Sequence, residues 1–183
     1  LGSSSISSNT IAKSTIAWPS AVSSDSSNGT IEYATANPTT FITYNSKNYD
    51  WHFTGDSSAD NTRWTTSSSD KSIYDPCPAG WRVPDGGSNG IWSKAGFGNT
   101  TYDSTNEGIS FSISSPSKTW YPASGCRVYN DGGLSYVGNY GFYRSASLYD
   151  NSPCSLSFYG SGYGYPWDVN SRASGQSVRC LQE

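Results

Sequence analysis

The chain has 183 residues, a formal net charge of −3 and a sequence pI near 5.0. Its 11 Lys and Arg residues against 14 Asp and Glu leave no basic footprint for nucleic acid, and no stretch approaches the ~18 apolar residues of a membrane-spanning helix. Only 14% of residues are charged but 15% are aromatic, which argues against disorder and predicts a surface of hydroxyls, amides and rings.

The first part of the chain differs in composition from the rest. Residues 1–30 are rich in serine around one weakly apolar island, which predicts a linker or the tail of a preceding module that contributes at most one strand. From residue 31 onward apolar runs recur at short intervals. Residues 31–183 are therefore expected to form one domain.

Short elements are predicted along that domain. Apolar runs at 41–44 and 49–53 predict two strands. Residues 75–84 contain three prolines, which exclude a regular helix and favour an extended path. A short helix is expected between residues 85 and 97, where Ile91, Trp92 and Ala95 can share one side.

The second half of the domain favours strands and turns. Apolar residues at 109, 111 and 113 alternate with serine, as in a half-buried strand. Turns are expected at 130–133 and 138–139, and residues 177–181 predict a closing strand. Long stretches between these elements indicate ordered loops, which often carry binding or catalysis.

Catalytic patterns are scarce. His52 is the only histidine, and it lies in an aromatic run where a structural role is favoured over a catalytic one. Cys77, Cys126, Cys154 and Cys180 are too widely spaced for paired zinc ligands, and their presence in a chain rich in Ser, Thr, Tyr and Gly suits an exported protein. We therefore expect no catalytic residues, no metal and no cofactor.

The segment 143–168 carries the positive signal for function. Tyr, Ser and Gly with an occasional Arg or Trp is the composition of antibody recognition loops, in which Tyr offers amphipathic contact area at low entropic cost. An alternative is that these rings alternate into a sheet core. The candidate ligand-binding residues are Tyr143, Arg144, Tyr149, Asp150, Tyr159, Tyr163, Tyr165 and Asp168.

Several motifs resemble a known family. The run DPCPAGWRVP at 75–84 and the closing RASGQSVRC at 172–180 resemble the Fibrobacter succinogenes major paralogous domain of exported Bacteroidetes proteins. Segments 37–42, 49–51, 120–125 and 141–143 extend the resemblance, which covers about residues 35–183. Where that family usually has Tyr-Trp-Ser, this chain has Tyr143-Arg144-Ser145.

The resemblance implies both a fold and a function. The family is similar to C-type lectin-like domains, so we expect an α+β, strand- and loop-rich fold with one or two short helices. It is also similar to variable proteins of diversity-generating retroelements, including cell-surface and pilus-tip adhesins, in which a C-terminal region is rewritten at template adenines. Residues 143–174 occupy that place here. The implied function is cell adhesion or receptor binding outside the cell.

The expected partner is a protein or glycan on another cell, host or phage surface, whether the chain is a whole protein or part of a longer multidomain surface protein. Two other functions remain open. One is a structural pilin-type segment without its own ligand. The other is an enzyme of the formylglycine-generating type, for which Cys126 and Cys154 are the only spare cysteine pair.

Three expectations complete the hypothesis. Cys77 and Cys180, both inside family motifs, should form a disulfide. Calcium should not be required, because residues 166–170 offer only Asp168, with Asp150 at a distance, whereas calcium takes six to eight oxygen ligands. The eight candidate residues should share one exposed face above a buried scaffold that comprises Trp81, Trp120, Phe158 and Val178.

Overall fold

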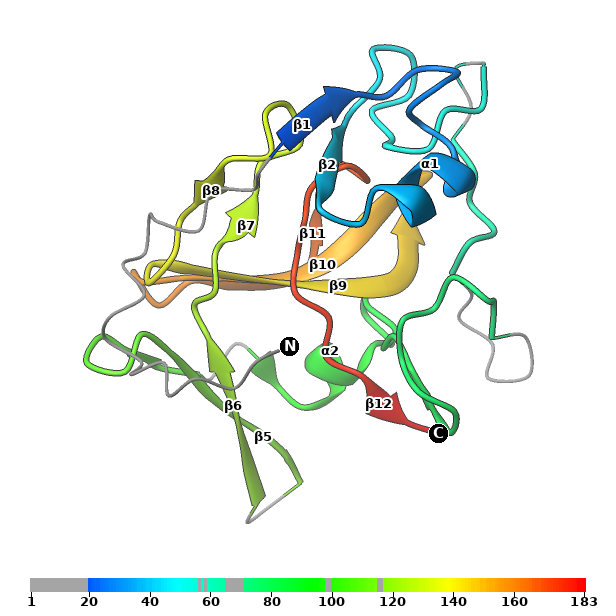
Figure 1. Ribbon diagram of the computed structural model, residues 1–183. Coiled ribbons are helices and arrows are strands. Elements are labelled where there is room, and N and C mark those ends of the chain that lie inside the picture. The colour runs from blue at the N-terminus through cyan, green and yellow to red at the C-terminus, as the bar shows by residue number, and fades with distance from the viewer. Residues whose placement is uncertain (1–19, 56, 58, 65–70, 98–99, 115–116) are drawn as a thin grey trace.

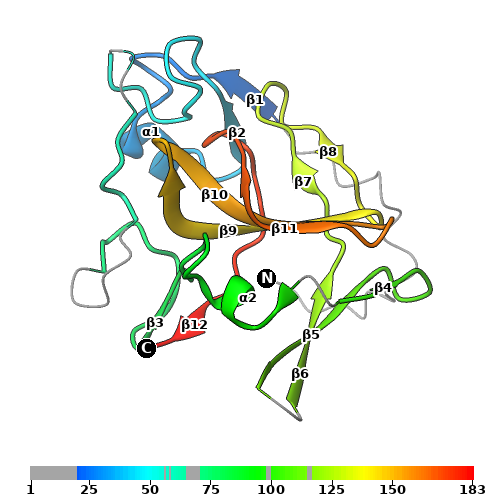
Figure 2. The ribbon, with the colours of Figure 1, turned by 180° about the vertical axis from the view of Figure 1, so that it is seen from behind.

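The computed structural model describes residues 20–55, 57, 59–64, 71–97, 100–114 and 117–183. Within these ranges the fold is mixed α+β and dominated by strands, with two short helices (Figures 1 and 2). None of the helices in that part of the chain has the length and apolar character to cross a membrane. The strand-rich α+β class predicted from the sequence is thus confirmed at this coarse level.

The centre of the molecule is an antiparallel sheet of β9 (Tyr140–Tyr149), β10 (Ser152–Tyr159) and β11 (Gly164–Val169), with β10 in the middle. A two-residue turn joins β9 to β10, because Asp150 and Asn151 both adopt positive φ, at 47° and 63°. Positive φ at both central positions is characteristic of a type I′ turn, whose backbone twist matches the right-handed twist of the two paired strands. This long hairpin positions both sites described below.

A second sheet packs over one face of the first. It consists of β4 (Tyr102–Asp103), β5 (Gly108–Ser114) and β6 (Ser117–Pro122). The main core includes Trp92 of α2 (Ile91–Lys94), and Leu156 and Phe158 of β10. The other buried members are Phe97, Ile109, Phe111, Tyr121, Ala123 and Tyr143. The strand predicted at 109–113 and the helix predicted between 85 and 97 are both present.

After β11 the chain crosses the opposite face of the central sheet before it reaches the C-terminus (Figure 1). We call residues 170–177 the crossing segment. Its backbone runs beside β9, where the N–H of Arg144 donates to the carbonyl of Ser177 at 2.8 Å. The Ser155 hydroxyl on β10 donates to Oε1 of Gln176 at 2.6 Å. The crossing segment therefore covers the middle of that face and leaves its two ends open.

The N-terminal part of the described chain packs onto the domain. Strand β1 (Ser20–Ser23) pairs in parallel with β2 (Thr40–Thr43), and Ser24 and Gly29 are buried. Thr30 caps α1 (Ile31–Ala36) by accepting a hydrogen bond from the N–H of Tyr33 at 3.1 Å. The predicted linker therefore ends earlier than residue 30, and its first 19 residues lie outside the described ranges.

The strand predicted at 49–53 is wrong. The chain turns there, because Tyr49 has φ 56° and the N–H of Asn45 bonds back to the carbonyl of Asp50 at 3.0 Å. The Asp50 carboxylate is buried and pairs with Arg63, so this aromatic run is organised by an ion pair. Alternation of aromatic and polar residues resembled a strand, but the buried charge decides the local path.

The C-terminal end of the domain is joined covalently to the proline-rich segment 75–84, as expected from the family motifs. Cys77 and Cys180 form a disulfide with their Cα atoms 5.7 Å apart. Beside it, β3 (Trp81–Arg82) pairs with β12 (Leu181–Gln182). A short pair β7 (Cys126–Arg127) and β8 (Leu134–Ser135) lies between the two larger sheets in the chain order.

Of the predicted buried scaffold, Phe158 is buried, whereas the two tryptophans are not. The exposed fraction is 40% for Trp81 and 37% for Trp120. Trp120 alternates with the buried Tyr121 on β6, so its ring lies outside, over the backbone of Gly108. Val178 is half-buried, where it packs against a small cluster around the disulfide.

Candidate functional site

Four tyrosines form a continuous line of rings across one end of the central sheet. We call Tyr136, Tyr140, Tyr159 and Tyr165 the tyrosine row. Tyr136 stacks on Tyr140 with ring centroids 4.8 Å apart, and Tyr140 meets Tyr159 edge to face at 4.7 Å. Tyr159 in turn meets Tyr165 at 6.0 Å. Each contact has the offset or edge geometry that aromatic rings favour.

The row faces away from the main core because of strand alternation. Leu156 and Phe158 of β10 point into the core, so Tyr159 and its cross-strand partner Tyr140 lie on the opposite face. Tyr165 is opposite Ser157, which shares that face. The two outer rings, Tyr136 and Tyr165, are each 50% exposed. The sheet therefore displays the row at its surface.

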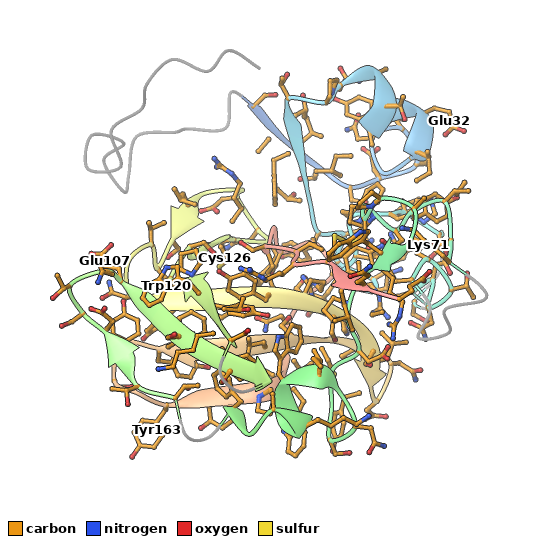
Figure 3. All side chains as sticks on the ribbon, turned by 90° about the horizontal axis from the view of Figure 1, so that it is seen from below. Glu32, Lys71, Glu107, Trp120, Cys126 and Tyr163 are labelled. Atoms are coloured by element: carbon orange, nitrogen blue, oxygen red, sulfur yellow. A yellow bond between two sulfur atoms is a disulfide. The ribbon has the colours of Figure 1, made fainter. Side chains whose placement is uncertain are left out.

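Further groups extend this surface. The ring of Tyr163 is exposed, and Tyr163 lies at the margin of the molecule in Figure 3, far in that view from Glu32 of α1. Asp168 accepts a hydrogen bond from the hydroxyl of Ser157 at 2.7 Å. Burial, and secondarily the nearby Asp168 carboxylate, raises the pKa of Tyr159 to about 12. The Tyr159 hydroxyl therefore keeps its proton at neutral pH, beside the Asp168 carboxylate.

The eight predicted ligand-binding residues do not share one face. Tyr159, Tyr163, Tyr165 and Asp168 gather around the tyrosine row, as expected. Tyr149 and Asp150 are exposed but lie at the other end of the β9–β10 hairpin. Tyr143 and Arg144 are buried, so their prediction as exposed ligand contacts is wrong.

Tyr143 belongs to the core for a clear reason. Its ring packs edge to face on Tyr121 at 4.9 Å and stacks on Phe158 at 6.2 Å. Its hydroxyl donates to the carbonyl of Pro122 at 2.7 Å, and burial raises its pKa to about 12. Sequence reasoning missed Tyr136 and Tyr140. The alternation of Tyr140 and Phe142 on the other face of β9 signalled Tyr140, whereas Tyr136 precedes the strand and no such pattern marks it.

The other end of the hairpin borders a cavity of about 240 Å³, which we call the arginine pocket. Its charged lining comprises Arg63, Arg144 and Arg172, with Asp60. The remaining lining residues are Ile31, Trp51, Asn61, Trp64, Tyr74, Ser145, Ala146, Leu148 and Pro153. The pocket thus combines guanidinium groups with aromatic and aliphatic walls.

An ion-pair network holds two of these arginines. Arg63 pairs with the fully buried Asp50, and its Nε lies 3.9 Å from Asp60. Nε of Arg172 lies 3.8 Å from the same Asp50 carboxylate. Arg172 also donates to the carbonyl of Asn151 at 2.7 Å. Asp50 is therefore the centre of a buried network that sequence reasoning did not find.

Arg144 is held differently. It is only 5% exposed, and its Nη2 donates to the carbonyls of Ser171 and Ser174, each at 3.0 Å. Its Nη1 is buried without a hydrogen-bond partner among the described residues. Burial, and secondarily the positive charge of Arg172, lowers the pKa of Arg144 to about 10, so the side chain still carries its charge at neutral pH.

Neither thiol has the environment of a reactive cysteine. Cys126 and Cys154, the pair that an enzyme of the formylglycine-generating type requires, are both free, and burial raises the pKa of each. A reactive cysteine needs the opposite shift, since the thiolate is the nucleophile. In the part of the chain that the structure describes, no group of three His, Cys, Asp or Glu side chains is arranged to hold a metal ion.

Searches of protein-family models, curated proteins and solved structures find no match to this chain. Inferences about its function therefore rest on the sequence motifs and on the two sites described above.

Proposed function

We propose that this chain is a non-catalytic, exported ligand-binding domain, of the adhesin or receptor-binding kind, on a C-type lectin-like scaffold. The observation that carries the proposal is the tyrosine row, whose rings form a surface that the fold does not need for its core. Monomeric proteins rarely display contiguous apolar patches without a partner.

The chemistry of the surface favours a protein or glycan ligand. Tyrosine rings offer flat apolar contact area, and their hydroxyls and the Asp168 carboxylate offer hydrogen bonds at the edges. Asp168 is the only charged group on β11, and no cation lies on that strand. This balance suits neutral sugars or polar protein surfaces and disfavours nucleic acid.

The scaffold supports the proposal in a second way. The motifs 75–84 and 172–180 meet in space through the Cys77–Cys180 disulfide, beside which β3 pairs with β12, the strand that follows the second motif. These are the segments that resemble the Fibrobacter succinogenes major paralogous domain. The cluster around the disulfide contains Val83 and Ala146 and none of the four tyrosines of the row. A change in the row therefore need not disturb the fold.

The experiment is binding of the purified domain to glycan and surface-protein arrays. The double variant Tyr136→Ser and Tyr165→Ser removes the two most exposed rings of the row and should abolish binding to any ligand found. Tyr149→Ser, which removes an exposed ring at the other end of the hairpin, is the matched control and should bind normally. Absence of any array ligand, or equal binding by both variants, supports a structural segment instead.

A further inference from the structure

We propose that the arginine pocket binds a small organic carboxylate with an apolar body, and that its carboxylate is held by the charge of Arg144. This site is separate from the tyrosine row and does not depend on the function proposed for that row.

The first observation is a buried charge without a counterion. Among the described residues no carboxylate lies within 4.0 Å of the Arg144 guanidinium, and Asp50 acts on it only from a greater distance. Burial of an unpaired guanidinium is costly, and two carbonyl acceptors on Nη2 satisfy only part of its hydrogen-bonding capacity. An anion in the adjoining cavity, which Arg144 lines, would supply the missing counterion.

The second observation is that the neighbouring carboxylates are already paired with other arginines. Asp50 is shared by Arg63 and Arg172, and Asp60 lies beside Arg63. Three guanidinium groups thus meet two carboxylates, which leaves one positive charge at Arg144. The pocket therefore favours a ligand with a single negative charge and disfavours cations.

The third observation concerns the body of the ligand. Trp51, Trp64 and Tyr74 supply aromatic walls, and four further lining residues are aliphatic: Ile31, Ala146, Leu148 and Pro153. The polar side chains are already paired: Ser145 donates to the carbonyl of Cys154 at 3.0 Å, and Asn61 bonds to Arg172 and Asn151. Few partners remain for the hydroxyls of a sugar acid. An aromatic or branched aliphatic body fits this lining better.

Access and size are consistent with a small ligand. Asn61, Tyr74 and Leu148 are exposed at the mouth, whereas Arg144 and Pro153 are buried further in. A volume of about 240 Å³ holds one ring or one branched side chain. The carboxylate chemistry is shared by a free organic acid and by the C-terminal residue of a peptide, so the experiment includes both.

The test is calorimetric titration of the purified chain with phenylacetate, neutral phenylacetamide, glucuronate and a tripeptide that ends in phenylalanine. We expect phenylacetate or the tripeptide to bind roughly tenfold or more tightly than phenylacetamide, since a hydrogen bond to a charged group is lost in the amide. Glucuronate should bind more weakly than phenylacetate. The tighter of the two apolar acids identifies the natural source of the carboxylate.

Two pairs of variants test the assignment to Arg144. Arg144→Met should lose carboxylate binding yet keep or raise the unfolding temperature, because it replaces an unpaired buried charge with an apolar side chain. Arg179→Met, a control outside the pocket, should bind normally. If Arg144→Met unfolds, Leu148→Glu places a repelling charge at the exposed mouth, with Leu148→Gln as its control.

Of the two Leu148 variants, only Leu148→Glu should lose carboxylate binding. The proposal is overturned if no carboxylate binds, if phenylacetamide binds as well as phenylacetate, or if folded Arg144→Met retains the affinity.

Discussion

The two ends of the β9–β10 hairpin carry opposite kinds of surface. The tyrosine row is neutral, open and backed across the sheet by the main core around Phe158. The arginine pocket is charged and concave, and it lies beside a small cluster of Cys77, Val83 and Ala146. At the tyrosine end the large apolar core stabilises the sheet, and the surface above it carries exposed rings. Where the core is small, a disulfide and buried ion pairs stabilise the structure.

The largest expected effect comes from removing the disulfide at the pocket end. The double variant Cys77→Ala and Cys180→Ala opens a covalent loop with a sequence separation of 103 residues. The chain-entropy model gives a loss of about 4–5 kcal/mol in the free energy of unfolding, measurable by chemical denaturation. Cys126→Ser, at a half-buried free thiol, is the control and should change it far less. Equal losses of unfolding free energy in the two variants would show that the disulfide does not stabilise the pocket end of the hairpin.

The buried ion pairs should rank next. Asp50→Asn leaves Arg63 and Arg172 without their shared carboxylate, and breaking a buried pair in this way costs about 3–5 kcal/mol. Denaturation midpoints measure the loss. Asp85→Asn breaks the more exposed pair with Arg82 and should cost at most about 1 kcal/mol. If both substitutions cost the same, Asp50 does not organise the pocket end.

At the tyrosine end of the hairpin, the most specific test is a substitution of a buried glycine. A Cβ at Gly141 would lie 2.1 Å from the ring of Phe158, so Gly141→Ala must displace a packed ring beneath the row. We expect a loss of about 1–3 kcal/mol, together with weaker binding at the tyrosine row and unchanged binding at the arginine pocket. Gly160→Ala has its nearest contact at 3.4 Å and should be close to neutral. A parallel loss at both sites would show that the two ends are not independent.

The smallest effect concerns alkaline pH. The folded chain holds the proton of Tyr159 up to about pH 12, whereas the unfolded chain releases it near 10.0. The folded state therefore binds more protons between these values, and stability falls as pH rises through them. Tyr159→Phe should make that fall shallower in thermal unfolding measured at a series of pH values. Trp167→Phe, which changes an exposed ring without a titrating group, should leave the slope unaltered.

The sequence predicted those elements whose pattern is local. Alternation at Ile109 and Phe111 gave a strand, and the prolines around Cys77 gave an extended segment. Arg144 shows why the rest was out of reach. A charged residue between Tyr143 and Ser145 suggests exposure, but the crossing segment, 27 to 30 residues further on, covers that face of β9. Burial of this kind depends on a distant segment, which periodicity does not detect.

The residues of the two sites show the same difference between contacts that follow from local sequence and contacts that join distant segments. Tyr159 and Tyr165 lie on the two strands joined by one turn, so their proximity follows from a short-range hairpin. Asp50 and Arg172 are brought together across 122 residues, and no local pattern in the sequence indicated that pair. The exposed aromatic Trp120 was also mispredicted, because the direction of its alternation on β6 depends on which face the second sheet buries.

The covalent loop also determines how the domain responds to mechanical load. A pull applied to the chain on both sides of the Cys77–Cys180 bond passes through that bond, so residues between the two cysteines are shielded from tension. The tyrosine row lies entirely inside the shielded part. The arginine pocket does not, because Trp51, Arg63 and Tyr74 precede Cys77 whereas Arg144 and Arg172 lie within the loop. Tension would therefore load the contacts between the two walls of the pocket, while the contacts within the tyrosine row stay unloaded.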